Sequence, residues 1–237
     1  MLRPLVCVWI LFLVACTASE TARLSPVDRS VQQFSTAPGT RIEKIRAGID
    51  GSWENRVTMP DSLDNRTILV VGLHWAGGPA TYREFHDCLL APAFKGQNAI
   101  LISPSTPTGS WFTPVDTARV KSIVRAARSV WQPNQVLMVG YSNGANGVWR
   151  FAEQEPEYFD YGIALAGAYE PSGPIRIPLT VFHGTADELF PIDRTRSYVS
   201  RAGDQVEFRA LEKLSHYQAC AYAPALRALV EQYFLNR

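Results

Sequence analysis

The chain has 237 residues, of which 46% are hydrophobic and 19% are charged, and its formal net charge is +1. This size and composition predict a single domain with a sizeable hydrophobic core. Lysines and arginines are scattered among the acids and form no basic stripe, which argues against a nucleic-acid partner.

The N-terminus has the pattern of an export signal. Arg3 is followed by an apolar run over residues 5–15, and then by Cys16. The run is shorter than the roughly 20 residues that a membrane-spanning helix needs, and it favours a secretory signal peptide. Its ending, Leu13-Val14-Ala15-Cys16, resembles a bacterial lipobox, in which the cysteine is lipidated and becomes the first residue of the mature protein. The alternatives are an ordinary signal peptide with a chance cysteine, or an uncleaved anchor.

This interpretation divides the chain into three parts. Residues 1–15 are the lipoprotein signal peptide, and residues 41–237 are the folded domain. Residues 16–40 are the lipidated Cys16 and a tether rich in Ser, Thr, Ala and Pro, within which a short strand or helix is allowed. Acyl chains on Cys16 would hold the protein at a membrane of the bacterial cell envelope. By comparison with known lipoproteins, Thr17 after the cysteine favours the outer membrane, with the domain in the periplasm or facing outward.

Two cysteines remain after the signal is removed and Cys16 is lipidated, namely Cys88 and Cys220. An oxidising compartment permits a disulfide between them. The alternative is two separate buried thiols.

Short apolar runs alternate with helical patterns along the domain. Residues 41–49 and 53–59 predict an opening hairpin, and residues 206–210 alternate as an edge strand does. Uninterrupted apolar runs are typical of parallel strands covered on both faces, and they occur at residues 68–71, 99–102, 136–139, 163–165 and 179–182. The pattern predicts an α/β fold with a mostly parallel central sheet flanked by helices.

Helix signals separate these strands. Thr113-Pro114 predicts the N-cap and first position of a helix whose apolar face runs from Val120 to Trp131, and residues 226–234 predict a terminal helix. No long insertion follows the strand that ends at Gly167, so we expect no cap domain over the site.

Ser142 lies in the pentapeptide Gly140-Tyr141-Ser142-Asn143-Gly144, directly after the predicted strand 136–139. This G-x-S-x-G pattern between a strand and a helix is typical of a nucleophile elbow. The tight turn exposes the serine Oγ and directs it at a histidine, and the flanking glycines avoid a clash between strand and helix. We therefore predict that Ser142 is a catalytic nucleophile.

The base and its orienting acid follow from chain order, since the partners of an elbow serine arrive as acid and then histidine. Of the four histidines, His216 is the one that lies downstream of a suitable acid, on the loop between the last strand and the terminal helix. The acid is assigned to Asp187, after the strand 179–182, with the adjacent Glu188 as the alternative.

An oxyanion hole needs two backbone donors. One is the N–H of Asn143, the residue after the nucleophile. The other is expected from the loop Leu73-His74-Trp75-Ala76-Gly77-Gly78, where glycines allow the backbone to approach a substrate. We assign it to Ala76, with Trp75 as the alternative.

Together these motifs resemble the α/β-hydrolase superfamily over about residues 41–237. More narrowly, they are similar to its cap-less secreted serine esterases, in the polyhydroxybutyrate-depolymerase and feruloyl-esterase-like group and the phospholipase/carboxylesterase group. Two departures stand out: Trp75 occupies a position where the family usually has glycine, and Ser215 replaces a glycine that often precedes the catalytic histidine. The resemblance implies a serine hydrolase that cleaves carboxylic esters through an acyl-enzyme.

Five aromatic residues flank the predicted site and are expected to form the substrate pocket: Trp75, Trp111, Phe112, Phe190 and Tyr217. The substrate would be a small-molecule or polymer-derived ester. The sequence has no metal-ligand cluster, phosphate loop or dinucleotide fingerprint, so we expect no metal and no cofactor. The same triad could serve a peptidase, a thioesterase or an acyltransferase, and a non-catalytic envelope lipoprotein with a hydrolase fold is a further alternative.

Overall fold

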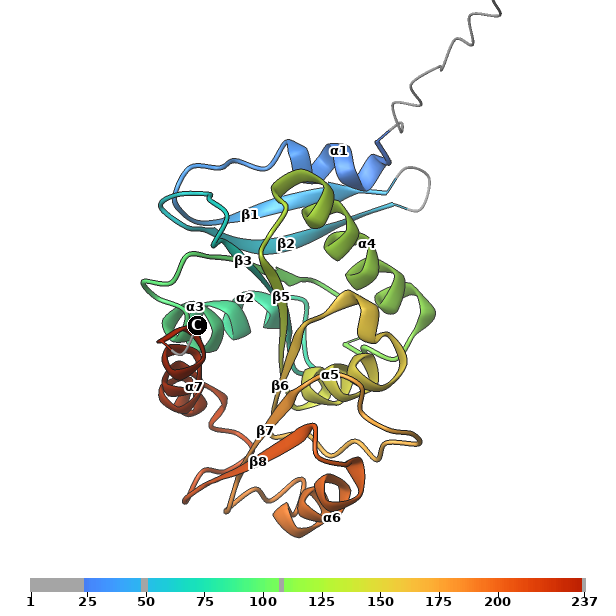
Figure 1. Ribbon diagram of the computed structural model, residues 1–237, viewed down its shortest axis with the longest axis vertical. Helices are drawn as coiled ribbons and strands as arrows, with labels where there is room; N and C mark the ends of the chain where they lie inside the picture. The colour runs from blue at the N-terminus through green and yellow to red at the C-terminus, as the bar shows by residue number, and fades with distance from the viewer. Residues whose placement is uncertain (1–23, 48–50, 107–108, 236–237) are drawn as a thin grey trace, which may run out of the picture.

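The computed structural model describes residues 24–47, 51–106 and 109–235. Within these ranges eight strands form one sheet in the spatial order β1-β2-β4-β3-β5-β6-β7-β8 (Figure 1). Their bounds are β1 Gly39–Arg46, β2 Ser52–Met59, β3 Ile68–Leu73, β4 Ala99–Pro104, β5 Gln135–Tyr141, β6 Tyr161–Leu165, β7 Leu179–Gly184 and β8 Val206–Leu211. β2 is antiparallel to β1 and to β4, and all other neighbouring strands are parallel. The predicted hairpin, α/β class and edge strand β8 are confirmed.

Helices cover both faces of the sheet (Figure 1). One face packs against α1 Pro26–Gln32, α4 Pro114–Trp131, α5 Asn143–Gln154 and α6 Ile192–Ala202. The other face packs against α2 Thr81–Phe85, the π-helical turn η2 His86–Leu90, α3 Ala91–Ala93 and α7 Ala223–Leu235. Two short 3-10 turns complete the fold, η3 Pro156–Tyr158 and η4 Ala219–Tyr222. Because both faces are covered, all six residues of β3 are buried.

The folded domain begins earlier than expected, because α1 lies inside the segment that was predicted to be tether. Ser25 caps this helix, and the Asp28 side chain binds the Ser25 backbone N–H in return. Val27 and Val31 of the helix, and Phe34 just after its end, are buried in the core that α4 shares. The tether prediction for residues 16–40 is therefore wrong from Ser25 onward, while its first part lies outside the described residues, as does the predicted signal.

α4 begins as predicted, with Thr113 as N-cap and Pro114 in the first turn. The Thr113 side chain accepts a hydrogen bond from the Asp116 backbone N–H, which satisfies one of the helix's free donors. Its buried residues lie on one side, so the helix covers the sheet and keeps a polar outer face. In the described ranges, no helix combines the length and apolar character required to cross a lipid bilayer.

The strand order reverses at β3, which lies between β4 and β5: β4 is added on one side of β3, and β5 and the later strands are added on the other side. The connections from β3 and from β5 therefore leave toward opposite faces, and open α/β sheets bind ligands in the crevice at such a point, beyond the carboxyl ends of the strands. The link between β6 and β7, residues 166–178, contains no helix. Nothing in that link forms a cap over the crevice.

A disulfide joins Cys88 in η2 to Cys220 in η4, with 5.2 Å between their Cα atoms. Of the two alternatives that the sequence allowed, the structure has the bridge. It connects segments that are 132 residues apart, and it holds η4 against the helical turn that follows β3.

Candidate active site

Ser142 stands on the turn between β5 and α5 in a conformation that few non-glycine residues adopt, with φ 55° and ψ −116°. Such a backbone costs on the order of 1–3 kcal/mol and persists only where the surroundings enforce it. Here the surroundings do so: a Cβ atom at Gly140 would overlap the backbone of Gly144, and one at Gly144 would overlap the carbonyl of Leu73. The serine side chain is thus presented at the carboxyl edge of the sheet, 8% exposed.

His216 follows β8 and reaches back to the nucleophile. Its Nε2 lies 2.9 Å from the Ser142 Oγ, and its Nδ1 lies 2.9 Å from Oδ2 of Asp187. With Nδ1 donating to the carboxylate, Nε2 is left as the acceptor for the serine proton. All three side chains are buried, and the structure brings together the three residues that the sequence assigned.

Asp187 is fixed from several sides at the end of β7. Its Oδ1 accepts hydrogen bonds from the backbone N–H groups of Leu189 at 3.0 Å and Phe190 at 2.7 Å. The buried His183 lies 3.3 Å from Oδ2 through its Nε2, which also donates to the Phe190 carbonyl at 2.7 Å. Burial lowers the pKa of His183, so this imidazole is a neutral hydrogen-bond donor beside the carboxylate.

The expected oxyanion donors lie on the two segments that border the crevice. Asn143 is the first residue of α5, so its N–H is among those that a helix leaves without an intrahelical partner. Ala76 and Trp75, on the loop after β3, line the same pocket as Ser142. The Asn143 side-chain amide donates to the carbonyl of Gly109, whose backbone packs close to Ala76.

The loop after β3 is also held from within the protein. His74 is 2% exposed, and its Nδ1 lies 2.7 Å from the carbonyl of Trp75. Burial lowers the pKa of His74 to about 4, so the ring is neutral and Nδ1 can donate to that carbonyl. The His74 carbonyl in turn accepts from the Trp111 indole N–H at 2.8 Å. These bonds fix the segment that carries the expected second oxyanion donor.

A pocket of about 690 Å³ opens beside Ser142 and His216. The remaining lining residues are aromatic, small or uncharged: Trp75, Ala76, Tyr141, Leu189, Tyr217, Gln218, Ala219, Cys220 and Ala221. Five of these come from the segment 217–221, which is therefore the principal wall. Of the five expected aromatic residues, Trp75 and Tyr217 line this pocket.

The other three aromatic residues have different places. Trp111 is 1% exposed and belongs to the core, because its indole binds the His74 carbonyl. Phe112 lies on the surface with its ring stacked on Tyr169, 6.2 Å away. Both expectations of pocket lining are therefore wrong. Phe190 does not line the pocket either, so that expectation is also wrong; its ring lies 5.0 Å from the His216 ring in an edge-on arrangement.

Sequence reasoning missed two residues that contact His216 through its backbone. The Tyr141 hydroxyl donates to the His216 carbonyl at 2.7 Å, and a Glu188 carboxylate oxygen accepts from the His216 N–H at 2.9 Å. Glu188 was the alternative to Asp187, but its carboxylate binds the backbone of the histidine and not the ring. Their positions in the sequence could have indicated both residues, because Tyr141 directly precedes Ser142 and Glu188 directly follows Asp187.

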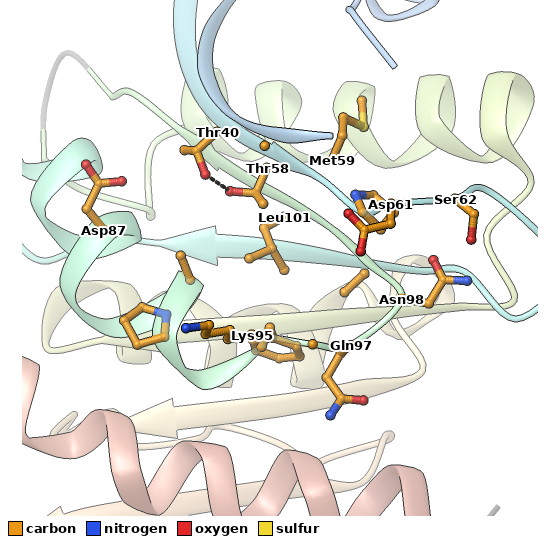
Figure 2. A pocket seen from close by; sticks show the side chains of 17 residues that line it. Thr40, Thr58, Met59, Asp61, Ser62, Asp87, Lys95, Gln97, Asn98 and Leu101 are labelled. Atoms are coloured by element: carbon orange, nitrogen blue, oxygen red, sulfur yellow. Dashed lines mark hydrogen bonds between the residues drawn. The ribbon is translucent and has the colours of Figure 1, made fainter. Parts of the chain in front are cut away.

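A second hollow of about 740 Å³ lies at the opposite edge of the sheet, where β4 begins and β2 ends. Figure 2 shows its mixed lining, including Asp61, Asp87 and Lys95, with Thr40 hydrogen-bonded to Thr58. It contains no serine–histidine–acid arrangement. The described residues contain no cluster of three or more metal-ligating side chains.

Similarity to known structures agrees with this geometry. A serine hydrolase homologue from Coxiella burnetii superposes with a TM-score of 0.66 at 17% identity, over 83% of this chain and all of that one. A poly(3-hydroxybutyrate) depolymerase from Bordetella parapertussis superposes with a TM-score of 0.64 at 16% identity, over 90% of this chain and 94% of that one. The chain has the α/β-hydrolase fold, in its form without a cap.

At the level of sequence, the chain is 28% identical over 202 residues to a protein named "Putative esterase NocK" from Nocardia uniformis subsp. tsuyamanensis. That match covers 76% of this chain and 57% of the Nocardia protein, so the chain spans little more than half of that relative's length. No protein-family model matches the chain.

Proposed function

We propose that this protein hydrolyses carboxylic esters by a serine mechanism. The observation that carries the proposal is the continuous chain of hydrogen bonds from Ser142 through His216 to Asp187, each link 2.9 Å long, beside an open pocket. The similarity to a protein named as a putative esterase, and to a structure named as a poly(3-hydroxybutyrate) depolymerase, supports the same activity.

Acylation starts when His216 Nε2 removes the proton of Ser142 and Oγ attacks the ester carbonyl carbon. Asp187 stabilises the imidazolium that forms. The N–H groups of Asn143 and Ala76 donate to the carbonyl oxygen as it becomes negative. His216 then gives its proton to the leaving alkoxide oxygen, the carbon–oxygen bond breaks, and the alcohol departs. In the second half, His216 deprotonates a water molecule that attacks the acyl-enzyme, and Ser142 regains its proton as the acid is released.

The pocket favours an uncharged acyl or aryl group. Neither lysine nor arginine lines it, so no basic side chain there would pair with an anionic substrate, and Trp75 and Tyr217 offer aromatic faces. Its volume is in the range of sites for small molecules. A single ester or the end of a polyester chain would fit this chemistry.

The test compares protein that starts at Thr17 with its Ser142→Ala variant on p-nitrophenyl acetate, butyrate and octanoate. Hydrolysis is expected from the wild type, with a rate at least about 10³-fold lower for the variant. Matched amide and thioester substrates, and an added alcohol as acyl acceptor, distinguish an esterase from a peptidase, a thioesterase and an acyltransferase. Inert wild type that also fails to react with a fluorophosphonate would instead support a non-catalytic lipoprotein.

We also propose that Cys16 is lipidated and anchors the domain at the bacterial cell envelope, in the outer membrane. The Leu13-Val14-Ala15-Cys16 sequence and the polar residues after it support this. Full-length protein should incorporate an alkyne-tagged palmitate and partition into the detergent phase of Triton X-114, whereas Cys16→Ser should do neither. Incorporation of the palmitate by Cys16→Ser would contradict the assignment of Cys16 as the lipidated residue.

A further inference from the structure

All four polar groups of His216 are bound by side chains. The ring uses Ser142 and Asp187, as described above. The backbone N–H donates to Glu188 at 2.9 Å, and the backbone carbonyl accepts from the Tyr141 hydroxyl at 2.7 Å. Each backbone partner is the chain neighbour of a triad residue, since Tyr141 precedes Ser142 and Glu188 follows Asp187.

His216 needs such support because it lies on a turn between β8 and η4, outside any helix or strand. A histidine there has no ladder of backbone hydrogen bonds to fix its position, and small displacements of a catalytic group reduce rates strongly. The two side chains connect this turn to β5 and to the segment after β7, which carry the nucleophile and the acid.

We propose that Tyr141 and Glu188 are positioning residues that hold the backbone of His216 at reacting distance from Ser142. The assignment rests on the proposed function, because it concerns the same triad. It goes beyond that function by giving two further residues a role in the reaction.

The environment of each residue suits this role. Tyr141 is 2% exposed and its ring is enclosed by the rings of Trp75, His216 and Tyr222. Burial raises the pKa of Tyr141, so its hydroxyl keeps its proton and remains a donor. Glu188 is an exposed residue, and its carboxylate accepts the His216 backbone N–H at 2.9 Å, so it acts on the position of the turn that carries the histidine.

The test uses three variants and one matched control. Tyr141→Phe removes a hydroxyl and leaves the packed ring, Glu188→Ala removes the acceptor, and Glu188→Gln retains an oxygen that can accept the same N–H. The control is Tyr161→Phe, which also removes a tyrosine hydroxyl. That hydroxyl forms a partly buried hydrogen bond with Thr180 at 2.6 Å, at the opposite end of the sheet from the triad. The rate of Ser142 labelling by a fluorophosphonate is measured together with kcat and KM on p-nitrophenyl butyrate.

Tyr141→Phe and Glu188→Ala should each lower the labelling rate and kcat by about tenfold, the value of one hydrogen bond, and leave KM within about twofold. Glu188→Gln should recover most of the rate lost in Glu188→Ala, and Tyr161→Phe should label like the wild type.

Labelling rates within twofold of wild type in both Tyr141→Phe and Glu188→Ala would overturn the proposal. So would an equal loss in Tyr161→Phe, which would indicate general destabilisation. If Tyr141→Phe fails to fold, the Glu188→Ala and Glu188→Gln pair decides. Labelling requires no ester: wild type that labels but cleaves no ester refutes the ester substrate and leaves the positioning role testable, whereas wild type that never labels refutes both.

Discussion

The backbone carbonyl of Leu73, at the end of β3, lies directly against the Cα atom of Gly144, at the start of α5. This contact joins the strand that leads into the expected oxyanion loop to the turn that carries the nucleophile. The two halves of the site therefore keep their relative position through backbone packing.

A methyl group at residue 144 should break this arrangement. Gly144→Ala is expected to destabilise the protein by about 1–3 kcal/mol, typical of overpacking, and to lower the rate of Ser142 labelling. Urea unfolding and fluorophosphonate labelling would measure both effects. Gly78→Ala is the control, since a Cβ there meets nothing within 4 Å. Equal behaviour of the two variants would contradict the packing argument.

Removal of the Tyr217 side chain should weaken substrate binding. Tyr217 lines the pocket and is 76% exposed, with its ring 5.9 Å from the ring of His216. Tyr217→Ala should raise KM for p-nitrophenyl butyrate by about three- to tenfold with a smaller change in kcat. Phe112→Ala removes a ring that stacks on Tyr169 away from the pocket and should leave KM unchanged. If Phe112→Ala raised KM as much as Tyr217→Ala does, Phe112 would have to be counted among the substrate-binding residues.

Reduction of the Cys88–Cys220 bond should affect both stability and the pocket. The bond closes a loop of more than 100 residues, so its loss is expected to cost about 2–5 kcal/mol of unfolding free energy. Because Cys220 lines the pocket wall, KM should also rise in the reduced protein. A Cys88→Ser/Cys220→Ser double variant should match the reduced wild type in urea unfolding, and it should not respond to reductant. A reductant response in the double variant would point to another cause.

Stability should fall with acid because of His86. This residue is fully buried, with Nδ1 2.9 Å from Ser103 Oγ and Nε2 2.7 Å from Thr58 Oγ1, and burial lowers its pKa to about 4. The unfolded chain, with a pKa near 6.5, therefore binds an extra proton between about pH 6.5 and 4. The stabilising contribution is complete above pH 6.5 and is lost as the pH falls, by up to about 1.4 kcal/mol per pH unit.

His86→Gln should reduce the number of protons taken up on unfolding by about one, so the free energy of unfolding should depend less steeply on pH. The variant should also be less stable at pH 7.5, because it leaves hydroxyl partners unsatisfied. Urea unfolding at pH 7.5, 6, 5 and 4 would measure the slopes. His74, whose pKa is also lowered to about 4, keeps part of the dependence in this variant. An unchanged slope would show that His86 does not carry the effect.

The sequence predicted the features that depend on local pattern and chain order. The apolar run 68–71 is typical of a strand covered on both faces, and the chain order of Ser142, Asp187 and His216 indicated the triad. The features that the sequence did not predict depend on which way a side chain points and on what it packs against in the folded protein. Trp111 follows a strand at the correct edge, yet its indole N–H bonds the His74 carbonyl inside the core. α1 was missed because Val27, Val31 and Phe34 are too few to stand out in a Ser- and Pro-rich segment, although Ser25-Pro26-Val27-Asp28 carries a capping box.

The early start of the folded domain limits how far a form lipidated at Cys16 could reach from the membrane. The helix cap at Ser25 leaves the nine residues 17–25 after Cys16. Fully extended, nine residues span about 30 Å, which is roughly the diameter of a small domain. A lipidated form would thus be confined to a shell one molecule thick above the bilayer, and it would meet substrates that diffuse along the envelope or collect at its surface.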